Sequence, residues 1–212
     1  MGTKILIIDY KVGNHQSIVN ALNFLGYDFI VSSRKSDIIK AQSYILPGVG
    51  AFGEAMKNFN KLDILDCLQE QVLIKKKPIL GICLGMQILA KDSEESGFCQ
   101  GLGWIDGHVV ALNKAKDLRI PHVGWDNIKL IKKDPLFLRT DNKELNYYFD
   151  HSYHFVCADK FISARCYYGE DFAVAVQKNN IFGVQFHPEK SQRNGLKLLR
   201  CFLDISLKYH SV

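Results

Sequence analysis

The apolar residues of the first ninety positions follow two alternating spacings. Short apolar runs alternate with segments in which apolar residues recur every three or four positions, and this alternation is typical of a parallel sheet wrapped by helices. The predicted strands are residues 4–9, 27–31, 44–46 and 78–82. We therefore expect a parallel sheet to form the first part of the fold.

The segments between these strands carry the signals of helices. In the first, the apolar positions are Ile18, Ala21, Leu22 and Leu25. Asn14 is a suitable N-cap for this helix, and Gly26 is suited to end it. Residues 51–74 are predicted to be mostly helical, with a break near Asn60-Lys61.

The chain changes character from about Gly97, where shorter segments rich in Tyr, Phe and Val begin. Such segments are typical of antiparallel strands and hairpins. The predicted strands are residues 147–149, 152–157, 161–168, 172–177 and 181–186, and residues 196–207 form a closing helix. No repeat or linker separates the halves. Residues 1–212 are therefore predicted to be one α/β domain, with a mainly parallel central sheet flanked by helices and additional antiparallel strands in the C-terminal half.

Composition and charge narrow the function classes. The residues are 47% hydrophobic and 23% charged, as in ordinary globular proteins. The formal net charge of +5 is scattered except at Lys75-Lys76-Lys77, which is too weak a bias for a nucleic-acid partner. No charged leader with an apolar core and no apolar run of about 18 residues is present. We expect a cytoplasmic protein with neither nucleic acid nor membrane as partner.

The cysteine and histidine spacings do not indicate a metal site. The six cysteines stand at positions 67, 83, 99, 157, 166 and 201, without a C-x-x-C pair. This favours reduced thiols over a disulfide framework or a zinc ribbon. His122, His151 and His154 lack accompanying cysteine or carboxylate spacing, so no metal is predicted.

The segment Gly81-Ile82-Cys83-Leu84-Gly85 has the spacing of a nucleophile elbow with Cys in place of Ser. It follows an apolar strand, and a helix is expected to begin immediately after Cys83. A β-carbon at either glycine would crowd the abrupt turn. The first N–H groups of the helix favour the thiolate, and that of Leu84 points at an oxyanion. Alone, the pattern fits a buried structural cysteine equally well.

A second segment, Phe186-His187-Pro188-Glu189, ends an apolar strand. Residues i and i+2 of an extended chain share a face, so His187 and Glu189 can lie side by side. A carboxylate on one imidazole nitrogen leaves the other free to take a thiol proton. By itself such a histidine is more often a surface residue, but together with the elbow it favours a Cys-His-Glu triad.

A third segment, Gly48-Val49-Gly50-Ala51-Phe52-Gly53, matches G-x-G-x-x-G after a predicted strand, with Asp66 and Glu70 near the expected acidic position. A dinucleotide site, and hence a nucleotide-dependent oxidoreductase, is therefore an alternative. Against it, the motif follows the third strand and enters through Pro47. These glycines could instead turn an N–H group towards an oxyanion beside the elbow.

Three blocks together resemble the signatures of class I, triad-type glutamine amidotransferases: Pro47-Gly48-Val49-Gly50, Gly81-Ile82-Cys83-Leu84-Gly85-Met86-Gln87 and Gly183-Val184-Gln185-Phe186-His187-Pro188-Glu189. Further segments resemble the glutaminase subunits of imidazole glycerol phosphate synthase. They are Ile8-Asp9-Tyr10 with Gly13-Asn14, Pro121-His122-Val123-Gly124-Trp125 and His151-Ser152-Tyr153.

The resemblance implies a role for each matched residue. It implies Cys83 as nucleophile, His187 as acid and base, and Glu189 as the orienting carboxylate. The oxyanion donors would come from Leu84 and from the loop Gly48, Val49 and Gly50. The glutamine substrate would be held by Gln87, Glu95, Ser152 and Tyr153. No cofactor is implied.

The resemblance also implies a partner. A glutaminase of this kind passes ammonia to a (β/α)8-barrel synthase subunit in a heterodimer, which makes imidazole glycerol phosphate and an aminoimidazole carboxamide ribonucleotide in histidine biosynthesis. The chain departs from the family pattern at Lys11, His15, Asp126 and Asp150-His151. These departures leave open a paralogous glutaminase that feeds a surface-polysaccharide sugar amidotransferase. A non-catalytic relative that only binds a partner is the remaining alternative, and the triad argues against it.

Overall fold

The computed structural model describes residues 5–13, 15–113, 118–140 and 145–208. The predicted N-cap Asn14 lies outside this part of the chain, as does the first residue of the predicted strand 4–9. The remaining predicted elements up to residue 207 can be compared directly with the structure.

Five parallel strands form the centre of the sheet. Their order is β2 (Phe29–Ser32), β1 (Ile5–Ile8), β3 (Ser43–Leu46), β4 (Ile79–Ile82) and β13 (Ile181–Val184). The last two strands come from opposite halves of the sequence and pair in register at their carboxyl ends. The carboxyl ends of parallel strands meet at one edge of a sheet, so the chain segments that follow β4 and β13 emerge side by side.

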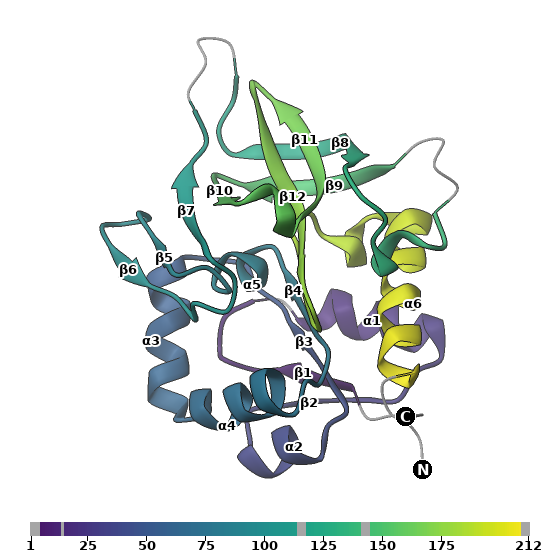
Figure 1. Cartoon of the computed structure of the whole chain (residues 1–212). Coiled ribbons are helices and arrows are strands. Elements are labelled where there is room, and N and C mark those ends of the chain that lie inside the picture. The colour runs from purple at the N-terminus through teal and green to yellow at the C-terminus, as the bar shows by residue number, and fades with distance from the viewer. Residues whose placement is uncertain (1–4, 14, 114–117, 141–144, 209–212) are drawn as a thin grey trace.

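Helices cover both faces of this parallel region (Figure 1). On one face lie α1 (His15–Leu25) and α6 (Gln192–Lys208); on the other lie α3 (Phe52–Leu62) and α4 (Leu65–Gln69), which continues as the π-helical turn η1 (Glu70–Ile74). The short helix α2 (Lys35–Lys40) places Ile38 in the same cluster as α3.

The strand β1 shows how the sequence divides into two cores. All four of its residues are buried, because helices cover both sheet faces. Successive side chains point to opposite faces. Ile5 and Ile7 accordingly join the cluster that contains residues of α1 and α6, whereas Leu6 and Ile8 join the cluster that contains residues of α3.

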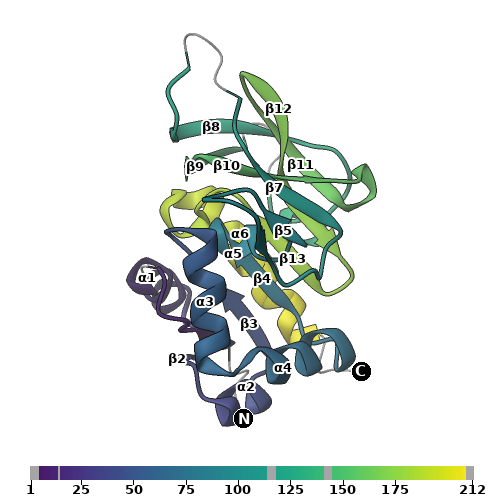
Figure 2. The same ribbon diagram turned by 90° about the vertical axis from the view of Figure 1, so that its left-hand side faces the viewer.

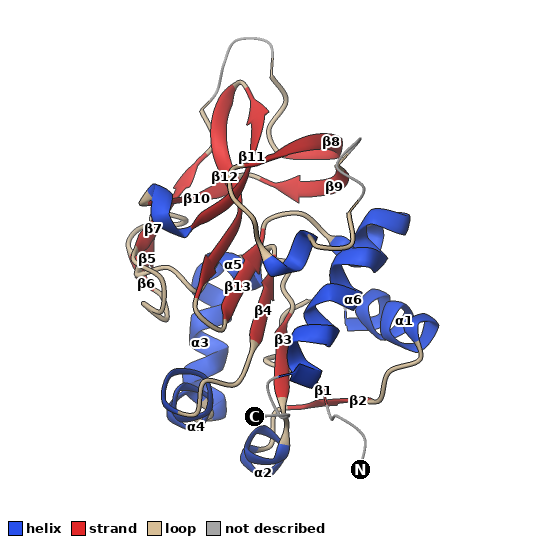
Figure 3. Cartoon of the chain, turned by 45° about the vertical axis from the view of Figure 1, so that its right-hand side comes forward, coloured by secondary structure: helices blue, strands red, loops and turns tan. Residues whose placement is uncertain are grey.

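An antiparallel region extends from β13 (Figures 2 and 3). The path runs through β12 (Glu170–Lys178), β10 (Tyr153–Cys157), β7 (Gly107–Ala111), β5 (Asp92–Ser93) and β6 (Cys99–Gln100). A branch runs from β12 through β11 (Ile162–Tyr168) and β8 (His122–Leu130) to β9 (Asn146–His151). Within the described residues, β7 and β5 form the one parallel pair of this region.

The architecture confirms the predicted α/β class with antiparallel strands added in the second half. The predicted break in the long helical segment is displaced: α3 ends at Asp63, which adopts a left-handed conformation with φ of 51°. The helix after Cys83, α5 (Leu84–Gln87), has only four residues. The closing helix starts at Gln192 rather than 196. Among the described helices, none has the length and apolar character needed to cross a bilayer.

Candidate active site

Cys83 lies at the turn between β4 and α5. Its φ of 52° and ψ of −110° fall outside the regions that residues with a β-carbon favour. The Cys83 N–H donates to the carbonyl of Val184 at 2.8 Å, which ties the turn to the neighbouring strand β13. A strained backbone fixed in this way presents the side chain at the end of the sheet, where the residue is 5% exposed.

The two glycines of the elbow are required by close packing. A β-carbon on Gly81 would lie 2.5 Å from the carbonyl oxygen of Gly85. One on Gly85 would lie 1.8 Å from the carbonyl oxygen of Leu46, at the end of β3. These distances confirm the steric argument made from the sequence, because α5 can rest on the strand ends only if both positions lack a side chain.

His187 and Glu189 follow the end of β13, next to the elbow. The His187 Nδ1 and Glu189 Oε1 atoms are 2.8 Å apart, and both side chains are buried. The predicted neighbourhood is therefore present, but its geometry differs from the extended chain that we expected. Strand β13 ends at Val184, and residues Pro188–Lys190 form a 3₁₀ turn, η4. Proline at the first position of this turn fixes φ at a value that suits it and lacks only an N–H group that the turn does not need.

The backbone of His187 is held from two directions. Its N–H donates to the carbonyl of Tyr148 on β9 at 2.8 Å, and its carbonyl accepts from the Ser191 hydroxyl at 2.6 Å. Helix α6 packs so closely on the turn that a β-carbon on Gly195 would lie 1.8 Å from the Pro188 carbonyl oxygen. The imidazole is thus positioned by strand β9, which is distant in sequence, and by the turn and helix that directly follow His187.

The electrostatics of His187 favour the imidazolium. Burial opposes the charge, but interactions with Cys83 and with the Glu189 carboxylate outweigh it and raise the pKa of His187 to about 10. Since Glu189 engages Nδ1, the ring atom left to interact with Cys83 is Nε2. That atom is buried without a formed hydrogen bond in this structure. The pair therefore favours a proton on the imidazole.

The loop of residues 48–50 packs over the start of α5. The Tyr10 hydroxyl donates to the Pro47 carbonyl at the entrance of the loop. A β-carbon on Gly48 would lie 2.6 Å from the Leu84 β-carbon and 2.8 Å from the Gly85 nitrogen. Gly50 has a φ of 111°, a conformation that glycine adopts readily. These glycines therefore serve close approach to the elbow.

The structure also bears on the dinucleotide alternative. A dinucleotide site uses an acidic residue about 20 residues after the glycines, at the ribose. Asp66 is instead an exposed residue of helix α4, and Glu70 is an exposed residue of η1. The glycine loop has a structural use at the elbow, whereas the acidic positions do not form the expected constellation.

A cavity of about 310 Å³ opens beside Cys83. The lining residues come from the glycine loop, the elbow, the segment before β6, Pro121 and the β9–β10 junction: Val49, Gly50, Cys83, Leu84, Gln87, Glu95, Pro121, Asp150, His151, Ser152 and Tyr153. All four residues predicted to hold substrate are among them, and so are three of the four predicted oxyanion positions. Gly48 packs against Leu84, and of the predicted triad it is Cys83 that faces the cavity.

Glu95 and Gln87 are fixed in the cavity wall. The Glu95 Oε2 accepts from the Phe52 N–H at 2.8 Å, which connects this wall to the start of α3. The Gln87 Nε2 donates to the Tyr153 carbonyl at 2.8 Å. Each residue therefore joins two segments that are far apart in the sequence.

Sequence reasoning missed one residue at the nucleophile. The Gln185 side chain is fully buried, and its Nε2 donates to the Cys83 Sγ at 3.6 Å. Gln185 lies in the third signature block, two residues before His187, but its neighbours gave no indication that its side chain reaches the sulfur. Among the described residues, no group of three or more His, Cys, Asp or Glu side chains forms a metal site, and all six cysteines are free.

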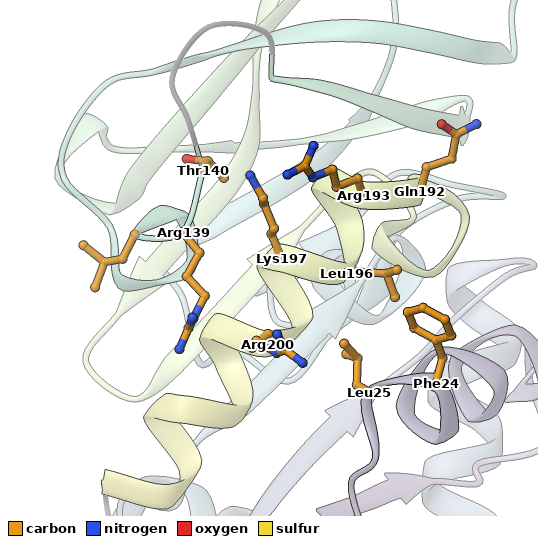
Figure 4. Close-up of a pocket in the computed structure, with 10 residues that line it drawn as sticks. Phe24, Leu25, Arg139, Thr140, Gln192, Arg193, Leu196, Lys197 and Arg200 are labelled. Carbon is orange, nitrogen blue, oxygen red and sulfur yellow. The ribbon is translucent and has the colours of Figure 1, made fainter.

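A second, larger groove lies between α1 and α6 (Figure 4). Its volume is about 890 Å³, and it is lined by basic residues of α6, including Arg193, Lys197 and Arg200, with Phe24 and Leu25 opposite. It shares no lining residue with the cavity beside Cys83. Its lining contains neither a cysteine nor an acidic residue, so it lacks the groups of the candidate active site.

The chain matches known proteins over most of its length. The family model described as "Glutamine amidotransferase class-I" matches residues 6–205. A Campylobacter jejuni protein named imidazole glycerol phosphate synthase subunit HisH 1 is 48% identical over 93% of this chain and 98% of its own. A Vibrio vulnificus protein named imidazole glycerol phosphate synthase subunit HisH 2 is 49% identical over 95% and 94%.

Solved structures share the fold at lower sequence identity. One described as a glutamine amidotransferase has a TM-score of 0.74 and 20% identity, covering 97% of this chain and 99% of its own. The structure of PurLQS from Thermotoga maritima has a TM-score of 0.73 and 18% identity, covering 97% and 99%. At such identities the likeness supports the α/β architecture alone.

Proposed function

The chain belongs to the class-I glutamine amidotransferases, and from this premise we propose that it is the glutaminase subunit of an imidazole glycerol phosphate synthase. Its reaction is the hydrolysis of L-glutamine to glutamate and ammonia. The observation that carries the assignment of the site is the meeting of a strained cysteine elbow with a buried His-Glu pair, at the carboxyl ends of β4 and β13.

The Cys83 thiolate attacks the side-chain carboxamide carbon of glutamine. The carbonyl oxygen becomes an oxyanion, and backbone N–H groups of Leu84 and of the loop 48–50 stabilise it. This role fits the position of Leu84 at the first turn of α5, where N–H groups have no partner within the helix. The packing of Gly48 on Leu84 keeps the two sources of donors together.

His187 manages the protons of both half-reactions. As imidazolium it protonates the departing nitrogen, so that ammonia leaves and a glutamyl thioester forms on Cys83. The neutral imidazole then takes a proton from water, which attacks the thioester carbonyl and releases glutamate and the thiolate. Glu189 holds Nδ1, which fixes the tautomer and supports the charged ring.

The cavity wall supplies the groups that hold the substrate. Glu95 offers a carboxylate to the α-ammonium group of glutamine while one of its oxygens stays on the Phe52 N–H. Gln87, Ser152 and Tyr153 line the same space. Their roles are those that the resemblance implies.

The partner in this proposal is a cyclase subunit with a (β/α)8 barrel, bound as a heterodimer. Two apolar side chains of β8, Val123 and Trp125, are 54% and 44% exposed. Trp125 pairs with Tyr148 of β9, whose carbonyl accepts the His187 N–H. A partner docked on this face would be close to the catalytic histidine and could receive ammonia before water protonates it.

In this proposal the partner subunit uses the ammonia to form two products. They are imidazole glycerol phosphate and the aminoimidazole carboxamide ribonucleotide of histidine biosynthesis.

A glutamine-analogue electrophile tests the chemistry of the site. The purified chain is incubated with the analogue, and the labelled peptide is identified by mass spectrometry. We expect one adduct on Cys83, no adduct in Cys83→Ala, and normal labelling in Cys201→Ala, whose buried thiol lies in α6. Labelling elsewhere, or an unlabelled Cys83, would contradict the proposal.

Reconstitution tests the acceptor. The chain is mixed with a barrel cyclase subunit or with a sugar amidotransferase, and glutamine-dependent product is measured for each. We expect glutamine-dependent formation of imidazole glycerol phosphate in the mixture with the cyclase subunit and no product in the mixture with the sugar amidotransferase. If product formed only with the sugar amidotransferase, the chain would still be a glutaminase, but its ammonia acceptor would lie in the sugar pathway rather than in histidine biosynthesis.

A further inference from the structure

A chain of polar side chains runs from the wall of the cavity to the sulfur of Cys83. The Gln87 Nε2 donates to the Tyr153 carbonyl at 2.8 Å and to the Gln185 Oε1 at 3.1 Å. The Gln185 Nε2 in turn donates to the Cys83 Sγ at 3.6 Å. The Gln185 side chain is fully buried, so its amide depends on these protein groups for its hydrogen bonds.

One atom, the Tyr153 carbonyl oxygen, determines which group donates and which accepts in each of these hydrogen bonds. The Tyr153 carbonyl oxygen can only accept, so the amide that meets it must present its NH₂ group. This orients Gln87, and the second N–H of Gln87 then requires an acceptor, which is the Gln185 oxygen. The NH₂ group of Gln185 is thereby left facing the sulfur. The orientation of both amides follows from the hydrogen bonds rather than from the similar shapes of their ends.

The same carbonyl also fixes His151. The His151 Nδ1 lies 2.9 Å from the Tyr153 oxygen, so this nitrogen carries the proton. The His151 Nε2 is then an acceptor, and the His122 Nδ1 at 3.1 Å donates to it. The His122 ring is stacked between Phe149 and Tyr168. Burial lowers the pKa of His151 to about 3, in agreement with a neutral ring in this tautomer.

Three groups face the sulfur: the His187 ring, the Gln185 amide and the Asp150 carbonyl. His187 interacts with it through Nε2, and Gln185 directs an amide N–H to it. The Asp150 carbonyl, at 3.8 Å, can accept only from the protonated thiol. An N–H donor gains strength when its acceptor becomes charged, and the gain is larger in a buried site. Gln185 thus favours the thiolate over the thiol.

We propose that Gln185 stabilises the Cys83 thiolate with its side-chain amide, and that Gln87 and His151 are positioning residues that fix this amide through the Tyr153 carbonyl. The inference rests on the proposed function, because it takes Cys83 as the nucleophile. It adds a side-chain donor at the sulfur that is separate from the backbone donors of the oxyanion.

Two substitutions at Gln185 separate the donor from the rest of the side chain. Gln185→Glu keeps an acceptor for Gln87 but replaces the N–H at the sulfur with a carboxylate. Gln185→Met removes both bonds and adds no charge. The rate of iodoacetamide reaction at Cys83 is measured against pH for the full chain, and the modified peptide is quantified by mass spectrometry.

We expect the pH of half-maximal alkylation to increase in both variants, and more in Gln185→Glu because its carboxylate repels the thiolate. At neutral pH this corresponds to a loss of about tenfold in rate for Gln185→Met and a larger loss for Gln185→Glu. Gln87→Met should shift the profile in the same direction by a smaller amount, because Gln185 remains but is no longer oriented.

Gln177→Glu is the matched control. It makes the same change of charge on β12, where the Gln177 amide donates to the Asn179 carbonyl. The pH profile of Cys83 alkylation in this variant should be the same as in the wild type. Thermal unfolding checks that each variant is folded. If Gln185→Glu does not fold, the alkylation profiles of Gln185→Met and Gln87→Met decide the test. Folded Gln185 variants with the wild-type profile would overturn the inference. Failure of wild-type Cys83 to react with a glutamine analogue would instead reject the proposed function.

Discussion

His187 keeps a charge in a place where burial opposes it. The residue is 1% exposed, yet its pKa is raised to about 10 because interactions with Cys83 and with the Glu189 carboxylate outweigh burial. The arrangement allows the imidazole to act as an acid at neutral pH and then as a base once its proton has gone to the leaving group. Its function depends on Glu189 as much as on the ring itself.

Glu189→Gln tests that dependence. Loss of the carboxylate removes one of the two charges that raise the His187 pKa, so the alkaline limit of glutaminase activity should move to lower pH. The rate constant kcat should fall by about 100-fold or more, as expected when the orienting group of a triad is lost. The measurement is kcat against pH for the complex with its synthase. Glu54→Gln on the exposed side of α3 should behave as wild type, and an unchanged profile for Glu189→Gln would contradict the role.

His151 gives a prediction for stability. Its pKa in the folded chain, about 3, lies below the ordinary histidine value of 6.5, so protonation favours the unfolded chain. The free energy of unfolding should be highest above pH 6.5 and decrease as the pH falls towards 3, with a slope of up to about 1.4 kcal/mol per pH unit from this group.

Urea unfolding at a series of pH values measures that slope. His151→Gln, which keeps an N–H for the Tyr153 carbonyl, should flatten it, whereas the same change at the exposed His108 should not. An equal slope in wild type and His151→Gln would show that acid sensitivity arises elsewhere.

At the level of the elements, the turn from β4 into α5 depends on the absence of side chains. Gly85→Ala would place a β-carbon 1.8 Å from the Leu46 carbonyl oxygen, and this clash is with the backbone rather than with a flexible side chain. We expect a loss of about 3 kcal/mol or more in stability, or no folded protein.

Gly53→Ala provides the matched control for that substitution. On α3 the nearest atom to the new β-carbon would be 3.8 Å away, and alanine favours helix, so stability should rise by up to about 1 kcal/mol. Denaturant unfolding measures both variants. A tolerated alanine at Gly85 would remove the steric argument for the elbow.

The sequence predicted those elements whose burial pattern is local. Strands β1, β3 and β4 are continuous apolar runs because helices cover both faces of the sheet, and the glycine spacing identified the elbow. Helix α2 buries only Ile38, which is too little periodicity to recognise. The end of α3 depends on the left-handed conformation of Asp63, which few sequence signals specify.

The parts of the site that depend on distant segments could not be predicted. Gln87 and Gln185 are 98 residues apart, and their contact exists because β13 pairs with β4. The His187–Glu189 pair was predicted, but on an extended strand rather than in the turn η4. Local patterns identified the residue types, whereas the directions of their side chains depend on tertiary packing.

For the whole molecule, the proposed partner face lies next to the site. The exposed Val123 and Trp125 lie on β8, and the neighbouring strand β9 carries the carbonyl that holds His187. In the proposed complex, contact at this face would therefore reach His187 through two adjacent strands.

Trp125→Ala tests this face. We expect affinity for the cyclase subunit to fall by about tenfold or more, since aromatic side chains at the centre of an interface contribute most of its binding energy. Titration calorimetry with the purified subunit measures the change. Phe98→Ala, also at an exposed aromatic residue but in the segment between β5 and β6, should bind as wild type. Equal affinities for Trp125→Ala and wild type would place the partner elsewhere.

In the proposed mechanism, Cys83 forms a covalent intermediate with glutamine. Rapid mixing of the complex with glutamine, acid quenching within one turnover and peptide mapping by mass spectrometry detect this intermediate. We expect a transient glutamyl group on the Cys83 peptide that decays at the rate of glutamate release and is absent in Cys83→Ala. Glutamate release without this adduct, or continued turnover by Cys83→Ala, would contradict it.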